Sequence, residues 1–230
     1  MSNGDLGWIT NFIWGIADDV LRDLYVRGKY RDVILPMTVL RRLDAVLEPT
    51  KKAVMDMKAT LDKAGITNQD AALRQAAGQD FYNTSKFTLR DLRARASDQR
   101  LKADFEDYLD GFSPNVQDIL ENFEFRNQIP RLSKADALGT LIEKFLDPSI
   151  NLSPNPVKNG DGSIKHPGLD NHAMGTIFEE LVRRFNEENN EEAGEHWTPR
   201  DVIRLMARLS SDAFPSHEFD FMLSNPPYGK

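Results

Sequence analysis

Apolar residues recur at helical spacing along the first two thirds of the chain. The first stripe, which predicts one face of an amphipathic helix, consists of Ile9, Ile13, Ile16, Val20 and Leu24. A second stripe runs from Val33 to Leu47, and there Asp32 is expected to cap the start of the helix. Pro36 is compatible with this helix because it falls near the first turn.

Three further helices are predicted before the pattern changes. The first covers residues 101–112 and is expected to end at Gly111, a residue type that often follows the last helical turn. The other two cover residues 116–123 and 135–145. No strand-like alternation longer than a few residues interrupts these stripes, so the N-terminal part is predicted to be an all-helical domain.

The segment from residue 147 to 168 breaks the helical pattern. It holds four of the twelve prolines and the turn-rich run Asn159-Gly160-Asp161-Gly162. A calcium loop is a poor interpretation, because it would put His166 where a bidentate glutamate belongs. A linker or a hairpin-like loop is therefore expected.

The last third begins with another helix and ends with a different kind of segment. Asp170 or Asn171 is expected to start the helix, whose apolar stripe is Met174, Phe178, Leu181 and Phe185. A further helix begins at Thr198, and residues 219–224 form the best strand candidate in the chain. These patterns predict a mainly α protein with a helical domain over residues 1–147, a linker over 148–168, and the beginning of an α/β domain over 169–230.

Composition narrows the class of protein. The net charge is −7, so a general phosphate-binding coat is not expected, and the densest basic stretch is Arg90, Arg93, Arg95 and Arg100. The absence of cysteine and the presence of only four histidines argue against a metal site. No apolar run is long enough to span a membrane and no secretory signal is evident, so we expect a cytoplasmic protein.

The tail carries the clearest chemical signal. The strand candidate runs directly into Asn225-Pro226-Pro227-Tyr228, which places this tetrapeptide at the carboxyl edge of a sheet, where ligands sit in open α/β folds. The Asn225 side-chain oxygen and the rigid Pro226 carbonyl could accept the hydrogens of an exocyclic base amine and free its lone pair for methyl transfer. Tyr228 could stack on the flipped base. Alternatively, Pro226 and Pro227 merely end a strand, and Tyr228 packs as core.

A second candidate segment precedes the Thr198 helix: Glu195, His196, Trp197, Thr198, Pro199 and Arg200. Thr198, Pro199 and Asp201 suit an ordinary helix start, and taken alone this capping interpretation is favoured. The free N–H groups of a helix N-terminus would also suit a ligand carboxylate such as that of S-adenosylmethionine, with Trp197 packed on the ligand.

Together these segments make the chain similar to the modification (M) subunits of type I restriction–modification systems, a family of adenine-N6 DNA methyltransferases. The stretches that carry the resemblance are residues 30–36, 40–44, 175–181, 194–203 and 225–228, which read YRDVILP, LRRLD, GTIFEEL, GEHWTPRDVI and NPPY. The resemblance runs from about residue 8 to 209 and resumes at 219.

The resemblance implies a helical N-terminal domain that contacts DNA and companion subunits, followed by an α/β domain that binds S-adenosylmethionine. It assigns Glu195 to Arg200 to the donor-binding segment and Asn225 to Tyr228 to the catalytic loop. The expected partners are DNA, the specificity subunit and the restriction subunit, with no membrane.

The sequence departs from the family where the donor should be held. Only residues 210–218, which contain no glycine, stand in place of the family's strand and glycine-rich loop, and the sequence stops at Lys230 where the family continues. One strand cannot build a doubly wound sheet, so this chain as written is not expected to methylate DNA unaided. The alternative is a non-catalytic helical module that docks to a specificity subunit or to DNA.

Overall fold

The computed structural model describes residues 3–96 and 100–188, and this part of the chain is mainly helical, as predicted. Its α-helices are α1 (Asn3–Leu21), α2 (Arg31–Leu47), α3 (Lys51–Lys63), α4 (Asp70–Ala77), α5 (Leu89–Arg93), α6 (Leu101–Asp110), α7 (Pro114–Asn122), α8 (Ile129–Lys134), α9 (Ala137–Phe145) and α10 (Asn171–Glu188). Three 3₁₀ turns, η1 (Arg27–Lys29), η2 (Glu48–Thr50) and η3 (Phe125–Asn127), and two short strands, β1 (Val157–Lys158) and β2 (Ile164–His166), complete it. None of the described helices is long and apolar enough to cross a membrane.

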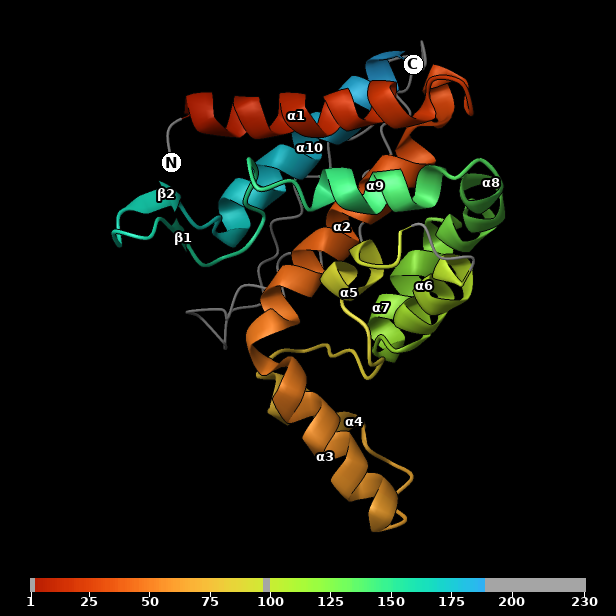
Figure 1. The fold of residues 1–230 in the computed structure, drawn as a ribbon, viewed down its shortest axis with the longest axis vertical. Helices are drawn as coiled ribbons and strands as arrows, with labels where there is room; N and C mark the ends of the chain where they lie inside the picture. Colours follow the sequence, from red (N-terminus) through yellow and green to blue (C-terminus); the bar gives the residue numbers. More distant parts are fainter. Residues whose placement is uncertain (1–2, 97–99, 189–230) are drawn as a thin grey trace, which may run out of the picture.

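Helix α2 is the centre of the molecule. Thirteen of its seventeen residues are buried, so it is covered on nearly all sides. Figure 1 shows it crossing the middle of the fold, and it packs against α1, α9 and α10. The helix continues through Pro36, which is buried within it. A polar residue on this helix is therefore a polar residue in the core.

The start of α2 differs from the sequence prediction. Asp32 is not the cap: the helix begins at Arg31, and Tyr30 occupies the N-cap position without a side-chain hydrogen bond. The reason is the preceding turn η1, which brings Tyr30 into helical geometry so that its carbonyl accepts the N–H groups of Val33 and Ile34. Asp32 lies in the first turn and faces Lys29 at 3.4 Å, where a carboxylate suits the positive end of the helix.

The stripe predicted for the last described helix is confirmed, and the first is confirmed in part: α1 ends at Leu21, so Leu24 lies in the turn after the helix, and Val20 is partly buried. Ile9, Ile13 and Ile16 of α1 are buried, and so are all four stripe residues of α10. Helix α10 begins at Asn171, and the Asp170 carboxylate accepts the Ala173 N–H at 2.7 Å, as expected of an N-cap. Helix α10 packs against α1 and α2, and its apolar face belongs to the same core.

The segment between α9 and α10 is a hairpin on an ordered base. Strands β1 and β2 pair antiparallel, which confirms the hairpin-like interpretation. Below them, the buried Asn151 side chain donates to the carbonyls of Asn155 and Pro167 at 2.9 and 3.0 Å. Gly168 is required here, because a Cβ at this position would lie 2.0 Å from the carbonyl oxygen of Pro154.

Helices α3 and α4 form an arm that points away from the rest of the fold (Figure 1). They pack chiefly on each other, and the buried residues of this α3–α4 arm are Val54, Leu73 and Ala77. Its surface is held by ion pairs within single helices, such as Lys58 with Asp62 at 2.8 Å and Arg74 with Asp70 at 2.7 Å.

Candidate functional site

The residues predicted to carry chemistry, Glu195 to Arg200 and Asn225 to Tyr228, lie outside the described residues. The helix from Thr198 and the strand over 219–224 lie outside them as well. Their predicted roles remain predictions. Of the stretches that carry the resemblance, the structure describes residues 30–36, 40–44 and 175–181, and the second of these forms the most polar part of the core.

Arg42 lies in the middle of α2 and is only 1% exposed. One terminal nitrogen donates to the carbonyls of Leu152 and Leu169, at 2.8 and 2.9 Å, and the other donates to the Asn171 side-chain oxygen at 2.8 Å. Burial lowers the pKa of the guanidinium to about 10, against the opposing effect of the Asp170 carboxylate. The group therefore remains charged at neutral pH, among oxygens that are themselves neutral.

Arg41, the preceding residue, makes a different connection. It is 9% exposed, and its Nε donates to the carbonyl of Phe145 at 3.2 Å. Phe145 is the last residue of α9; the Leu146 N–H reaches the carbonyls of residues 142–144, and Arg41 supplies the donor for the carbonyl of Phe145. Two adjacent arginines of α2 thus hold two different segments: Arg41 holds the end of α9, and Arg42 holds the chain that leads into α10.

Asp44 completes the polar set of α2 by joining it to α5 and α6. Its Oδ1 accepts the Leu89 backbone N–H and the Tyr108 hydroxyl, each at 3.1 Å. Burial raises the pKa of the Asp44 carboxyl, and these two hydrogen bonds oppose that shift. Burial also raises the pKa of Tyr108 well above its ordinary value, so the phenol is neutral and acts as the donor.

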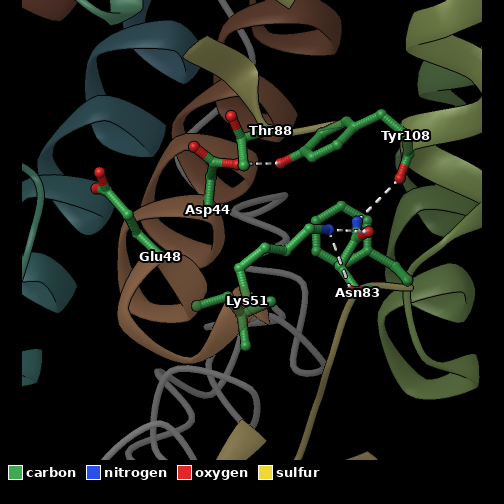
Figure 2. A pocket seen from close by; sticks show the side chains of 8 residues that line it. Asp44, Glu48, Lys51, Asn83, Thr88 and Tyr108 are labelled. Carbon is green, nitrogen blue, oxygen red and sulfur yellow. Dashed lines mark hydrogen bonds between the residues drawn. The ribbon is translucent and has the colours of Figure 1, made fainter. Parts of the chain in front are cut away.

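A small pocket opens between α2, α3 and the chain around residue 83. Figure 2 shows Asp44 facing Tyr108 on one side and Lys51 reaching Asn83 on the other. The cavity volume is about 10 Å³, room for about one water molecule, so the pocket does not accommodate an organic substrate.

Lys51 connects the base of the α3–α4 arm to this pocket. Its Nζ donates to the backbone carbonyl and the side-chain oxygen of Asn83, at 3.2 and 3.0 Å. Burial lowers the pKa of Lys51 to about 8, although Asp44 and other carboxylates oppose the shift. Asn83 in turn links Lys51 to α6, because the Asn83 Nδ2 donates to the Tyr108 carbonyl at 2.9 Å.

Gly111 lets the chain around residue 83 cross the end of α6. The helix ends here as predicted, but in right-handed geometry (φ −69°) rather than the left-handed geometry typical of a terminal glycine. The need for glycine is steric, because a Cβ would lie 2.4 Å from the Ser85 backbone nitrogen.

The densest basic stretch is partly neutralised. Arg90 pairs with Glu48 at 3.0 Å, and Arg95 pairs with Asp104 at 2.7 Å while lying over the Phe87 ring. These contacts support the interpretation of the stretch as a solvated face rather than a phosphate-binding one.

The role of residues 40–44 is not predicted by the sequence. The signal is present, because two arginines and an aspartate interrupt the mostly apolar run of residues 33–47, and a helix buried on most sides must give such groups partners. The partners are 45 to 129 residues away in the sequence, so spacing alone could not identify them.

Two family models match the chain. Residues 9–145 match the model described as the HsdM N-terminal domain, and residues 169–214 match the model described as N-6 DNA Methylase. No curated protein matches, and neither does any solved structure. The first match ends at Phe145, where Arg41 holds α9, and the second begins at Leu169, whose carbonyl Arg42 holds.

Proposed function

Because the chain belongs to the HsdM N-terminal domain family, the modification subunits of type I restriction–modification systems, we propose that it acts in the transfer of a methyl group from S-adenosylmethionine to adenine N6 in DNA. The observation that carries the proposal is the order of the two family matches, a helical HsdM domain followed, after residues 146–168, by an N-6 DNA methylase region. The proposed setting is the cytoplasm, where the subunit would reach DNA.

The proposed chemistry rests on the two predicted segments. The Thr198 helix start would hold the donor carboxylate, with Trp197 against the ligand. Asn225 and Pro226 would accept the two hydrogens of the adenine amine, so that its lone pair would attack the donor methyl as the bond from that methyl to sulfur breaks. The demethylated donor would then leave as a neutral thioether, and the methylated nitrogen would release one proton to solvent. Tyr228 would hold the flipped base by stacking, and Pro227 would keep the loop rigid.

The proposed partners are DNA, a specificity subunit and a restriction subunit. The full sequence is acidic, with a net charge of −7, and Arg90 and Arg95 of the basic stretch form ion pairs with acidic side chains. Recognition of DNA by this subunit alone would therefore be weak, which favours a companion subunit as the source of affinity and sequence choice.

The test is transfer of a labelled methyl group to DNA by the chain assembled with its specificity subunit. We expect label transfer that depends on S-adenosylmethionine and falls at least about 100-fold in the Asn225→Ala variant, because one of the two acceptors for the amine is lost. Asn68→Ala is the matched control, since Asn68 is exposed in the loop between α3 and α4. Full activity of Asn225→Ala would refute the role given to Asn225.

The second candidate is a helical module that docks without catalysis. It is favoured by residues 210–218, which contain no glycine where the family has its glycine-rich donor loop. Co-purification with a specificity subunit, together with no binding of S-adenosylmethionine in a calorimetric titration, would establish this alternative in place of the first.

A further inference from the structure

The hydrogen bonds of Arg42 cross from one family match to the other. Arg42 belongs to α2, within the HsdM match, whereas Leu169 and Asn171 are the first and third residues of the methylase match. The remaining acceptor, the Leu152 carbonyl, lies in the segment between the matches. One side chain thus gathers both ends of the 152–169 segment and the start of α10.

Helix α10 is also held by two side-chain hydrogen bonds, from Arg184 to Asn11 at 2.6 Å and from Arg31 to Asn186 at 3.5 Å, and by apolar contacts. Phe178 and Phe185 are each 1% exposed, and the Phe185 ring lies 4.7 Å from the ring of Trp14 on α1. Apolar packing of this kind fixes how deeply a helix lies but tolerates sliding along the groove, whereas a planar guanidinium with several fixed acceptors sets one register.

The position of α10 bears directly on the proposed donor-binding segment. Glu195, the first residue of that segment, follows the end of α10 at Glu188 by seven residues. Six residues separate the two, so the placement of α10 on the helical domain limits how far from that domain the donor-binding segment can begin.

We propose that Arg42 is a positioning residue that holds the start of the methyltransferase region on the helical domain and so sets the affinity for the methyl donor. This inference rests on the proposed function. A buried charge whose acceptors are neutral is costly, and its Nε has no hydrogen-bond partner among the described residues. An apolar residue would avoid that cost but would leave the Leu152 and Leu169 carbonyls and the Asn171 oxygen without their donor, so the arginine is explained by the acceptors that it gathers.

Arg41 provides a matched control. It is an arginine on the same helix, it is also buried, and it bonds to Phe145 within the HsdM match. The variants Arg42→Met and Arg41→Met therefore remove the same functional group from adjacent positions, and only one of them should release α10. Asn171→Ala is a milder second variant, because it removes a single acceptor of Arg42.

The experiment compares these variants in the full chain assembled with its specificity subunit, at a temperature well below melting. Calorimetric titration with S-adenosylmethionine gives the Kd, and hydrogen exchange reports the amides of residues 169–188. We expect Arg42→Met to raise the Kd about tenfold and to speed exchange in α10, Asn171→Ala to do both to a smaller extent, and Arg41→Met to leave both within twofold of the parent. Arg42→Lys should restore part of the affinity.

Several outcomes would overturn the inference. Parent affinity in the folded Arg42→Met variant would do so, and so would equal changes in the Arg41→Met variant, which would indicate a general loss of stability. Failure of the parent itself to bind the donor would refute the proposed function instead. If the parent does not bind the donor, hydrogen exchange still tests the role of Arg42. Unchanged exchange of residues 169–188 in Arg42→Met would then refute the claim that Arg42 holds α10 in place.

Discussion

The body around α2 and the α3–α4 arm are both helical, but they are held together in different ways. In the body, Arg41, Arg42 and Asp44 bond to partners far away in the sequence, and the apolar core is continuous from α1 to α10. In the arm, ion pairs join residues four apart and few side chains are fully buried. The buried arm residues Val54, Leu73 and Ala77 belong to the same core, but the arm relies more on local contacts than the body does, so damage should spread further in the body than in the arm.

The largest expected effect is on the free energy of unfolding, when a buried aromatic residue of the body and a buried aliphatic residue of the arm are each replaced by alanine. Phe185→Ala should cost about 3–5 kcal/mol of unfolding free energy, and Val54→Ala about 1–2 kcal/mol. Calorimetry should show a lower melting temperature for the whole molecule in the first variant. In Val54→Ala, hydrogen exchange should become faster mainly in α3 and α4. Faster exchange throughout α1 and α2 in this variant would contradict the comparison.

The next effect concerns the carboxylate that joins α2 to α5 and α6. Asp44→Ala leaves the Leu89 N–H and the Tyr108 hydroxyl without their acceptor, and we expect a loss of about 2–4 kcal/mol in urea unfolding. Asp44→Asn keeps an oxygen at the same place and should lose about 1 kcal/mol or less. Equal losses in the two variants would show that the charge, rather than the acceptor, matters.

A smaller effect is expected at the crossing of α6. Gly111→Ala should destabilise by about 1–3 kcal/mol, because the backbone of Ser85 must move to admit the methyl group. Gly15→Ala is the control: nothing lies within 4 Å of its added Cβ, and an alanine within α1 should stabilise by about 0.5–1 kcal/mol. Thermal melts of the two variants should therefore shift in opposite directions.

The smallest effect lies at the junction of arm and body and depends on pH. The pKa of Lys51 is about 8 in the folded protein and 10.5 ordinarily, so the unfolded state binds more protons between these values. The burial cost of the charged Lys51 is therefore full below pH 8 and relieved as the pH rises towards 10.5. From pH 7 to pH 10, the unfolding free energy of the parent should rise by about 1 kcal/mol relative to that of Lys51→Met, after allowance for the partial exposure of Lys51. Thermal melting of both proteins at the two pH values measures this difference.

The helices of the body follow from the sequence where the apolar stripe is dense. The stripes of α1 and α10 predict these helices because packing buries one face of each, and the stripe of α2 predicts a helix that is buried on most sides. The proline- and turn-rich segment 147–168 predicts a linker or a hairpin-like loop, and the hairpin of β1 and β2 lies there. The arm is different: Val54 is the fully buried residue of α3, so its stripe is thin and predicts no separate helix. The start of α2 does not follow from a capping side chain, because the Tyr30 carbonyl at the end of turn η1 accepts the first helical N–H groups.

The candidate site divides in the same way. The chemistry of Asn225 to Tyr228 and the donor role of Glu195 to Arg200 follow from local residue types, and they stay predictions. The positioning roles of Arg41, Arg42 and Asp44 depend on which distant segments fold against α2. No local sequence pattern encodes these contacts, because the sequence around a buried arginine is the same whether the arginine bonds to α9 or to the start of α10.

The seat of α10 on α1 and α2 has a consequence for exchanging parts between relatives. The boundary between the two family matches falls near residue 168, but the core continues across it to Phe185. A chimera joined at that boundary would present a foreign helix to Trp14 and a foreign helix start, in place of Leu169 and Asn171, to Arg42. A junction after Glu188 would keep α10 together with the α1 and α2 residues that it packs against. The end of α10 is therefore the better place to join the two parts of a chimera.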